Sequence, residues 1–417
     1  MTETVDTELE LWRAGVRRWL SGLLPRRAES TRVWGEGDPD LAVFRSLPHE
    51  EEVALLDKVR SYRRARYDAG YGALTLPAEY GGAGLPSVYS VAFAEEEHAF
   101  DVPLSTEIIS VTTGLVGSAV SVFGTVVQRE QFARAFLRTD MLCCQMFSEP
   151  GAGSDLAGLT TRAIRDGDEW VVDGQKIWTS QAQFADLGFL LARTNPDVVK
   201  QAGITAFLIP LDTPGLDIRP IRQMSGPASF NEVFLTEARI PDSLRIGEPG
   251  EGWRVANATL GFERSSSGSG HRRKGGNVDD VLALAGQLGA MSDPVLRQRL
   301  ADLVVRTTLQ SATVERVARA SAAGSRPGAA ASLGKLISSD NLVRIGDVAT
   351  DLLGSQIAAD TGQWGTFAWT EHVLGAPGYR LAGGTDEIQR NIIAERVLGL
   401  PPEHRTDKDP FSALRKA

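Results

Sequence analysis

The first third of the chain carries apolar residues at the spacing of a helix. Between Leu9 and about Phe136 they recur every three or four positions, which predicts a mainly helical region. The turn-rich stretch 76–86 (LPAEYGGAGLP) interrupts this pattern. Gly81 and Gly82 within it can adopt backbone angles that other residues avoid, so we expect a loop here.

The middle of the chain shows a different pattern. From about residue 141 to residue 249, short runs rich in Val, Ile, Phe and Trp alternate with turns. Such runs predict strands, so we expect a compact β domain, a barrel or a sandwich. Asp173 and Gly174 separate two of these runs. Because Asp-Gly is a common hairpin turn, we expect a hairpin at this point.

Helical spacing returns after Gly252. The predicted helices span residues 253–264, 278–288, 294–323, 330–353 and 386–398. Pro294 suits the first turn of its helix, and Asp293 is a candidate N-cap. Helical, β and helical blocks in this order predict an α+β protein of three domains. These are an N-terminal helical domain over 1–139, a middle β domain over 140–251 and a C-terminal helical domain over 252–417.

Composition and charge narrow the class of protein. Hydrophobic residues make up 42% and charged residues 23% of the 417 residues, which is the balance of a packed globular protein. The net charge is -9. Because an acidic surface repels phosphates, we expect no nucleic-acid partner.

The cysteines and the apolar runs bear on the compartment. Cys143 and Cys144 are the two cysteines and are adjacent, and neighbouring cysteines rarely form a structural disulfide. Together with five scattered histidines they give no metal-ligand spacing, so no metal site is expected. The sequence shows neither a run of apolar residues long enough to cross a membrane nor a secretory leader. We therefore expect a cytoplasmic protein with no membrane partner.

Two motifs in the β region indicate chemistry. Residues 147–155 (FSEPGAGSD) read as a strand end that runs into a glycine-containing turn, which exposes backbone N–H groups and hydroxyls suited to the polar edge of a flat heterocycle. Residues 174–180 (GQKIWTS) place a Trp that can lie against a ring and a Ser that can bind its edge. Either motif alone is commonly an ordinary turn or a core position. The pair at this spacing predicts a flavin pocket.

Both motifs resemble the flavin-binding segments of the acyl-CoA dehydrogenases. The stretches 76–84, 230–242, 250–256 and 383–401 resemble other recurring segments of that family, so the resemblance covers nearly the whole chain in order. It implies a helical N-terminal domain, a middle β domain and a C-terminal four-helix bundle that mediates tetramer formation. It also implies FAD as the cofactor, an acyl-CoA substrate and an electron-transfer flavoprotein or similar acceptor.

The resemblance assigns cofactor contacts residue by residue. The segment 145–154 and residues 178–180 would contact the isoalloxazine, Ser154 would also lie near the CoA moiety, and residues 384–386 would follow the ribityl and phosphate groups. The implied cofactor-binding residues are Gln145, Phe147, Ser148, Ser154, Trp178, Thr179, Ser180, Gly384, Thr385 and Asp386.

The implied reaction is α,β-desaturation of an acyl-CoA thioester. A carboxylate removes the α-proton while the β-hydrogen leaves as hydride to flavin N5. Many family members carry this base immediately before the Gly-Thr of the last motif, where this chain has Gly383. Residues 260–264 (LGFER) resemble the alternative arrangement, in which the base lies on the first helix of the C-terminal domain. Glu263 is therefore the candidate base.

Three further expectations follow from this arrangement. The absent side chain at Gly383 leaves volume for the Glu263 carboxylate, and the Gly383 N–H can donate to the thioester oxygen. Arg264 is a candidate for orienting Glu263 or for binding substrate. The competing interpretation of Glu263 is a solvated helix residue paired with a nearby Arg, as for most glutamates.

The chain departs from the family where many relatives bind the adenosine half of FAD. The Arg-x-x-Phe-Gly motif is missing after Gly276, and residues 351–355 (DLLGS) place Asp351 where the Gln of a Gln-x-x-Gly-Gly motif would stand. An acid beside a pyrophosphate is unfavourable unless it is solvated or paired. We therefore expect a homo- or heterotetramer, with a hypothesis that a non-identical partner subunit holds the outer half of FAD.

Two other functions remain open from the sequence. The chain could be a flavin-dependent monooxygenase or oxidase on the same fold, for which the glycine at 383 would be expected. It could also be an FAD-poor subunit of a heteromeric acyl-CoA dehydrogenase. The Glu263 segment argues against the first alternative, and the intact 147–155 and 174–180 motifs argue against the second.

Overall fold

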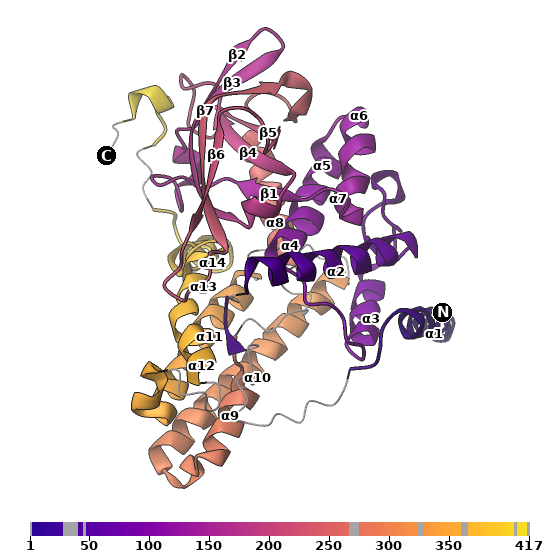
Figure 1. Cartoon of the computed structure of the whole chain (residues 1–417), viewed down its shortest axis with the longest axis vertical. Coiled ribbons are helices and arrows are strands. Elements are labelled where there is room, and N and C mark those ends of the chain that lie inside the picture. The colour runs from indigo at the N-terminus through magenta and orange to yellow at the C-terminus, as the bar shows by residue number, and fades with distance from the viewer. Residues whose placement is uncertain are drawn as a thin grey trace.

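The structure is a computed structural model and describes residues 2–27, 41–44, 47–266, 275–322, 329, 331–359, 366–403 and 407–414. Figure 1 shows a β-sheet in the upper part of the molecule, the N-terminal helices beside it, and the long C-terminal helices below. The predicted α+β class and the order of helical, β and helical blocks are confirmed. In the part of the chain that the structure describes, no helix is long and apolar enough to cross a membrane.

The N-terminal block is helical, as predicted. Its helices are α1 (Thr2–Leu23), α2 (His49–Asp68), α3 (Ser87–Glu97), α4 (Glu107–Ser110), α5 (Gly117–Phe123), α6 (Val126–Gln128) and α7 (Arg134–Arg138). The loop between α2 and α3 uses its glycines as expected. Gly81 has φ +84°, and a Cβ on Gly82 would lie 2.0 Å from the Leu76 carbonyl oxygen.

The middle block is a single mixed sheet of eight strands in the described residues. They are β1 (Cys143–Met146), β2 (Arg162–Asp166), β3 (Glu169–Ser180), β4 (Leu187–Arg193), β5 (Ile204–Pro210), β6 (Leu216–Ile221), β7 (Phe230–Pro241) and β8 (Arg245–Ile246). Their order is β6-β7-β3-β2-β4-β5-β8, and β1 pairs with β4 in parallel. β2 and β4 are joined at one residue pair, Arg162 with Arg193.

The residues of strand β4 show that both faces of the sheet are packed against other parts of the protein. All seven of its residues are buried. Phe189 and Leu191 belong to a core shared with α5, α7 and the helix after the sheet, whereas Leu190 and Ala192 belong to a second core that the strands form with α2 and α4. Neighbouring strand residues point to opposite faces, so an uninterrupted apolar run must be packed on both sides.

The expected hairpin at Asp173 and Gly174 is wrong. Both residues lie inside β3, where the pairing with β7 shifts register between Val172 and Gly174. The hairpin turn from β2 to β3 falls instead at Gly167 and Asp168. The Asp173 carboxylate accepts a hydrogen bond from the Glu237 N–H at 3.0 Å, so it stabilises a β-bulge and not a turn.

The C-terminal block consists of helices close to the predicted bounds. They are α8 (Gly252–Ser266), α9 (Val278–Gln287), α10 (Pro294–Ala322), α11 (Ala331–Leu353), α12 (Thr366–Gly375), α13 (Gly378–Leu381) and α14 (Asp386–Arg396). The predicted cap of α10 is confirmed, because Asp293 accepts hydrogen bonds from the N–H groups of Val295 at 2.7 Å and Leu296 at 3.2 Å. In Figure 1, α13 and α14 lie below the lower end of the sheet.

The end of the described chain returns to the β domain. The Phe411 N–H donates to the Val198 carbonyl at 2.9 Å, and the Phe411 ring lies 3.5 Å from the Arg193 guanidinium carbon. Asp407 pairs with Lys200 at 2.6 Å. The C-terminal segment therefore packs against strand β4 and the loop that follows it.

Candidate active site

The segment 147–155 forms a tight turn that is hydrogen-bonded to β3. Glu149 and Ala152 exchange backbone hydrogen bonds of 3.1 and 3.0 Å across Pro150 and Gly151, and the Ile177 N–H donates to the Ser148 carbonyl at 3.0 Å. We call residues 149–152 the glycine turn. A Cβ on Gly151 or on Gly153 would meet nothing within 4 Å, so this part of the segment faces open space.

A buried ion pair lies beneath the glycine turn. The Lys176 ammonium donates to Glu149 Oε1 at 2.8 Å and to the Phe147 carbonyl at 3.1 Å. The Glu149 carboxylate also accepts from the N–H groups of Thr160 at 2.6 Å and Thr161 at 2.9 Å. The Lys176 and Glu149 side chains are 0% and 3% exposed. The pair therefore joins the two flavin-like motifs inside the protein.

Burial and pairing set the ionisation of this pair. Burial lowers the pKa of Lys176 to about 8, although the nearby Glu149 carboxylate opposes the shift. Burial by itself raises the pKa of Glu149, but Lys176 and the donors of Thr160 and Thr161 together lower it to about 2. Both groups are therefore charged at neutral pH. Sequence reasoning missed the pair, although both residues lie inside the two motifs that it singled out.

Trp178 combines exposure with an unusual backbone. It is 56% exposed and has φ +60°, which is uncommon for a residue other than glycine. The pairing of β3 with β7 shifts register between Lys176 and Thr179, so Trp178 stands out from the sheet. Its indole packs edge-on against Phe230, with ring centres 5.9 Å apart. An exposed large aromatic in a strained conformation is typical of a binding site.

The other predicted residues of the two motifs divide by exposure. Thr179 is fully buried, and its hydroxyl has no hydrogen-bond partner among the described residues, whereas Ser180 is partly exposed. Gln145 and Ser148 are partly exposed, and Ser154 is exposed. Phe147 is buried and packs against Phe189 with ring centres 5.6 Å apart. The outer surface of the motifs is therefore formed by Trp178 and the serines.

Gly383 and Gly384 form a second turn, between α13 and α14. They have φ +64° and +88°, and we call them the diglycine turn. The buried Gln389 amide donates to the carbonyls of Gly383 at 3.0 Å and Gly384 at 3.3 Å. Thr385 caps α14, because its hydroxyl accepts from the Ile388 N–H at 3.2 Å. The turn is therefore fixed by the first turn of the helix that follows it.

A series of aromatic rings runs from Trp178 towards the diglycine turn. Beyond Trp178, Phe230 packs edge-on against Phe44 at 5.7 Å between ring centres, and Phe44 stacks on Tyr379 at 5.4 Å. Tyr379 lies in α13, just before the diglycine turn. Residues from all three sequence regions therefore take part in one series of ring contacts, which extends from the predicted site of the β domain to the helix before Gly383.

The Asp386 side chain is buried, unlike the exposed residues of the site. Its carboxylate is 3% exposed and accepts from Ser339 at 2.9 Å, from Arg380 at 2.7 Å and from Lys335 at 3.3 Å. Burial raises the pKa of Asp386, but these hydrogen bonds outweigh burial and hold the pKa below its ordinary value. The side chain therefore supports the diglycine turn from inside, next to Gly384 and Thr385.

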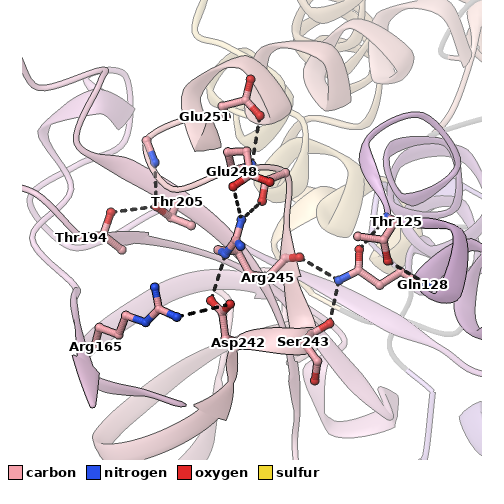
Figure 2. A network of polar contacts seen from close by, with 12 residues as sticks. Thr125, Gln128, Arg165, Thr194, Thr205, Asp242, Ser243, Arg245, Glu248 and Glu251 are labelled. Atoms are coloured by element: carbon pink, nitrogen blue, oxygen red, sulfur yellow. Dashed lines mark hydrogen bonds and ion pairs between the residues drawn. The ribbon is translucent and has the colours of Figure 1, made fainter. Parts of the chain in front are cut away.

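Glu263 and Arg264 lie near the end of α8, and their side chains lie outside the part of the structure that is described. The beginning of α8 is well defined (Figure 2). The Gln128 amide donates to the carbonyls of Ser243 and Arg245 at 2.7 Å each, and Arg245 pairs with Asp242 at 3.0 Å. Glu251, just before α8, accepts from the Glu248 N–H at 3.0 Å. This network joins the N-terminal helices to the sheet where α8 begins.

Asp351 has a partner in its own domain. It forms an ion pair with Arg299 of α10. Both side chains are partly exposed, and the negative charge of Asp351 is balanced by Arg299 of the same chain.

The residues of the segments 147–155 and 174–180 fit the isoalloxazine end of a flavin. Trp178 offers an exposed aromatic face, the open side of Gly151 and Gly153 allows close approach of a flat ring, and Ser148 and Ser180 offer hydroxyls at the same strand ends. A flat heterocycle with a polar edge requires this combination of stacking surface and hydrogen-bonding groups.

Comparisons with known proteins agree along most of the chain. The sequence matches three family descriptions: "Acyl-CoA dehydrogenase, N-terminal domain" over residues 43–140, "Acyl-CoA dehydrogenase, middle domain" over 144–237 and "Acyl-CoA dehydrogenase, C-terminal domain" over 250–398. It is 37% identical over 402 residues to "Acyl-CoA dehydrogenase IpdE1" of Mycobacterium tuberculosis (strain ATCC 25618 / H37Rv), which covers 95% of this chain and 99% of that protein.

Two solved structures have the same fold. The "Tcur3481-Tcur3483 steroid ACAD" superposes with a TM-score of 0.74 at 27% identity, covering 95% of this chain and 98% of that one. The "ChsE4-ChsE5 complex from Mycobacterium tuberculosis" superposes with a TM-score of 0.70 at 25% identity, with the same coverage of 95% and 98%. Each of these titles names two proteins.

Proposed function

The chain belongs to the acyl-CoA dehydrogenase family, a family of oxidoreductases, and we propose that it catalyses the FAD-dependent α,β-desaturation of an acyl-CoA thioester. The observation that carries this proposal is the series of ring contacts that runs from Trp178 through Phe230 and Phe44 to Tyr379. This series links the flavin-type surface at Trp178 to α13, the helix that ends just before the side-chain-free Gly383.

The residues of the flavin-like motifs and those at the diglycine turn have distinct roles in this proposal. Trp178, Ser148 and Ser180 would hold the isoalloxazine, and Gly384 and Thr385 would lie along the ribityl and phosphate groups. When bound, FAD supplies the acceptor for the hydride that leaves the β-carbon. The Gly383 N–H would donate to the thioester oxygen, which gains negative charge as the α-proton leaves.

Glu263 is our candidate for the base that takes the α-proton. Position 383 has no side chain, so a carboxylate must come from another element, and α8 carries Glu263 in the segment 260–264 that resembles the alternative family arrangement. A neighbouring Arg264 would orient this carboxylate or bind the substrate. The Gln128 and Arg245 contacts would keep α8 in place while the side chain acts.

The proposal is tested by anaerobic titration of the purified protein with short, branched, long and steroid CoA thioesters, following the flavin absorbance. We expect at least one thioester to bleach the flavin. Glu263→Gln should keep the bound, yellow flavin but lose about 10²- to 10⁴-fold in the rate of bleaching, the usual contribution of a general base. Glu315→Gln on the exposed side of α10 is the matched control and should bleach normally. Normal bleaching by Glu263→Gln would reject the assignment of the base.

The outer half of FAD is proposed to be held by a non-identical partner subunit. Residue 351 is an Asp, so this segment has no side-chain amide there for the pyrophosphate, and its carboxylate is paired with Arg299. The two structural neighbours whose titles name two proteins support a heteromeric assembly. A fully flavinylated homotetramer formed by this chain alone would contradict this part of the proposal. We also propose that an electron-transfer flavoprotein or a similar acceptor takes the electrons and that the protein is cytoplasmic.

One observation favours a second candidate function. Gly383 leaves the usual position of the base empty, as a flavin-dependent oxidase or monooxygenase would allow. Rapid oxygen consumption by the reduced protein without any acyl-CoA would favour this alternative. Slow reoxidation by oxygen together with bleaching by a thioester would favour the dehydrogenase.

A further inference from the structure

We propose that Lys176 is a positioning residue of the cofactor site, which holds the glycine turn and Trp178 in one fixed arrangement against the flavin. The inference rests on the proposed function, since it assumes that these two elements contact FAD. It assigns a role to a side chain that touches neither the cofactor nor the substrate.

Two consecutive residues of one motif, Lys176 and Ile177, contact three consecutive residues of the other, 147–149. The Lys176 ammonium donates to the Phe147 carbonyl and to Glu149, while the next N–H, that of Ile177, donates to the Ser148 carbonyl between them. Trp178 follows immediately. Any shift of the glycine turn relative to β3 would therefore break contacts at three successive residues.

The buried charge of Lys176 is not explained by the stability of the core. The side chain is 0% exposed inside a sheet whose other buried positions are largely apolar. Burying an ion pair gives little or no net stability compared with apolar residues of similar size. A methionine would fill the space, but it could not donate to Phe147 and Glu149 together. The ammonium is therefore better explained by the geometry that it imposes than by stability.

Glu149 does not depend on Lys176 for all its hydrogen bonds. The N–H groups of Thr160 and Thr161 and the Thr160 hydroxyl also donate to its carboxylate. Removing the ammonium leaves these donors in place, so the carboxylate keeps much of its solvation. What is lost is the link between the glycine turn and the strand that carries Trp178.

The test compares Lys176→Met, the double variant Lys176→Met/Glu149→Gln and the control Lys58→Met, which alters an exposed lysine of α2. The dissociation constant of FAD and the shape of the flavin absorption band are measured for each holoprotein, and circular dichroism checks folding. We expect both Lys176 variants to bind FAD about 10- to 100-fold more weakly, the size of effect that follows when residues that orient metal ligands are lost. The double variant leaves no buried unpaired charge, so it should fold even where the single variant does not.

A measurement on the unaltered protein is an independent check. The charged groups that act on Lys176 are Glu149 and Arg193. Above a pH of about 8, where the lowered pKa of Lys176 predicts loss of its proton, FAD should be released more readily from the natural protein. The double variant should lack this change with pH.

The outcomes distinguish a failure of this inference from a failure of the proposed function. Reduction of the natural protein by a thioester, together with wild-type affinity and spectrum in a folded Lys176→Met or double variant, would overturn only the role of Lys176. A natural holoenzyme that contains no FAD, purified together with any subunit that accompanies it, would overturn both. Weaker FAD binding in the folded double variant, with an unchanged Lys58→Met control, would support the positioning role.

Discussion

Each of the two turns of the candidate site rests on a buried carboxylate, but the two carboxylates are held differently. Glu149 begins the glycine turn and pairs with Lys176, which is itself fully buried. Asp386 follows the diglycine turn and pairs with Arg380 and Lys335, whose side chains are 42% and 22% exposed. Water can therefore reach the partners of Asp386 and replace their contacts. It cannot reach Lys176, the partner of Glu149.

This difference separates two ways of fixing a binding loop. At the glycine turn, a charge pair within the core sets the geometry, and the turn itself faces open space. At the diglycine turn, the backbone conformation and the neutral Gln389 amide set the geometry, and the charged groups reach solvent. The first turn should respond most to a change of charge, and the second to the addition of a side chain.

The largest effect is expected from Glu149→Gln. This change leaves the Lys176 ammonium buried without its counter-charge, which typically costs 3 to 5 kcal/mol. Because Lys176 already has a lowered pKa and can release its proton, we expect a loss near the lower limit, about 3 kcal/mol. Urea unfolding at pH 7 measures it. A loss below about 1 kcal/mol, the usual size for an exposed pair, would show that the two carboxylates are equivalent.

The diglycine turn is tested by Gly384→Ala. A Cβ at this position would lie 2.7 Å from the Gln389 amide nitrogen, and φ +88° is strained for alanine. We expect a loss of about 2 kcal/mol, in which strain and the displaced Gln389 hydrogen bonds combine. Gly399→Ala is the matched control, because Gly399 has φ +69° but nothing within 4 Å of the added Cβ.

Thermal or urea unfolding of both glycine variants separates the two contributions. The control should lose only the strain, about 1 kcal/mol. Equal losses in Gly384→Ala and Gly399→Ala would mean that Gln389 contributes nothing to the diglycine turn. A greater loss in Gly384→Ala, accompanied by weaker FAD binding, would confirm that contribution.

The sequence predicted the features that depend on neighbouring residues. The start of α10 follows from Pro294 and the Asp293 cap, and both flavin-type motifs lie at the strand ends where their residue types indicated. The hairpin prediction was wrong because the chain contains Asp-Gly at 166–167 as well as at 173–174. The pairing of β3 with β7 decides between them, and that pairing is not a local property.

The features that the sequence did not reveal depend on residues far apart. Lys176 and Glu149 are 27 positions apart, and Phe44 meets Tyr379 across most of the chain. Periodicity and capping carry no information on such contacts, since they describe a single element at a time. The role of Glu263 stays a prediction for the same reason, because it depends on where the end of α8 directs one side chain.

The smallest effect is expected from Asp386→Asn. Its partners Arg380 and Lys335 reach water, so we expect a loss of about 1 kcal/mol at pH 7, the size of an ordinary hydrogen bond. The effect should also depend on pH. A carboxylate whose pKa is lowered by folding stabilises fully above its unfolded-state pKa, and the stabilisation is lost as the pH falls towards the folded-state pKa.

The two carboxylates should therefore lose their contributions over different ranges of pH. The loss should begin near the ordinary pKa of 4.5 for Glu149 and continue to about 2, whereas for Asp386 it should begin near 3.8. Urea unfolding between pH 7 and pH 3 measures both. Relative to the natural protein, Asp386→Asn should be less stable by a constant amount down to about pH 4 and converge with it below 3.8, while Glu149→Gln should begin to converge at a higher pH. A stability difference between Asp386→Asn and the natural protein that stays constant down to pH 3 would show that folding does not lower the pKa of Asp386.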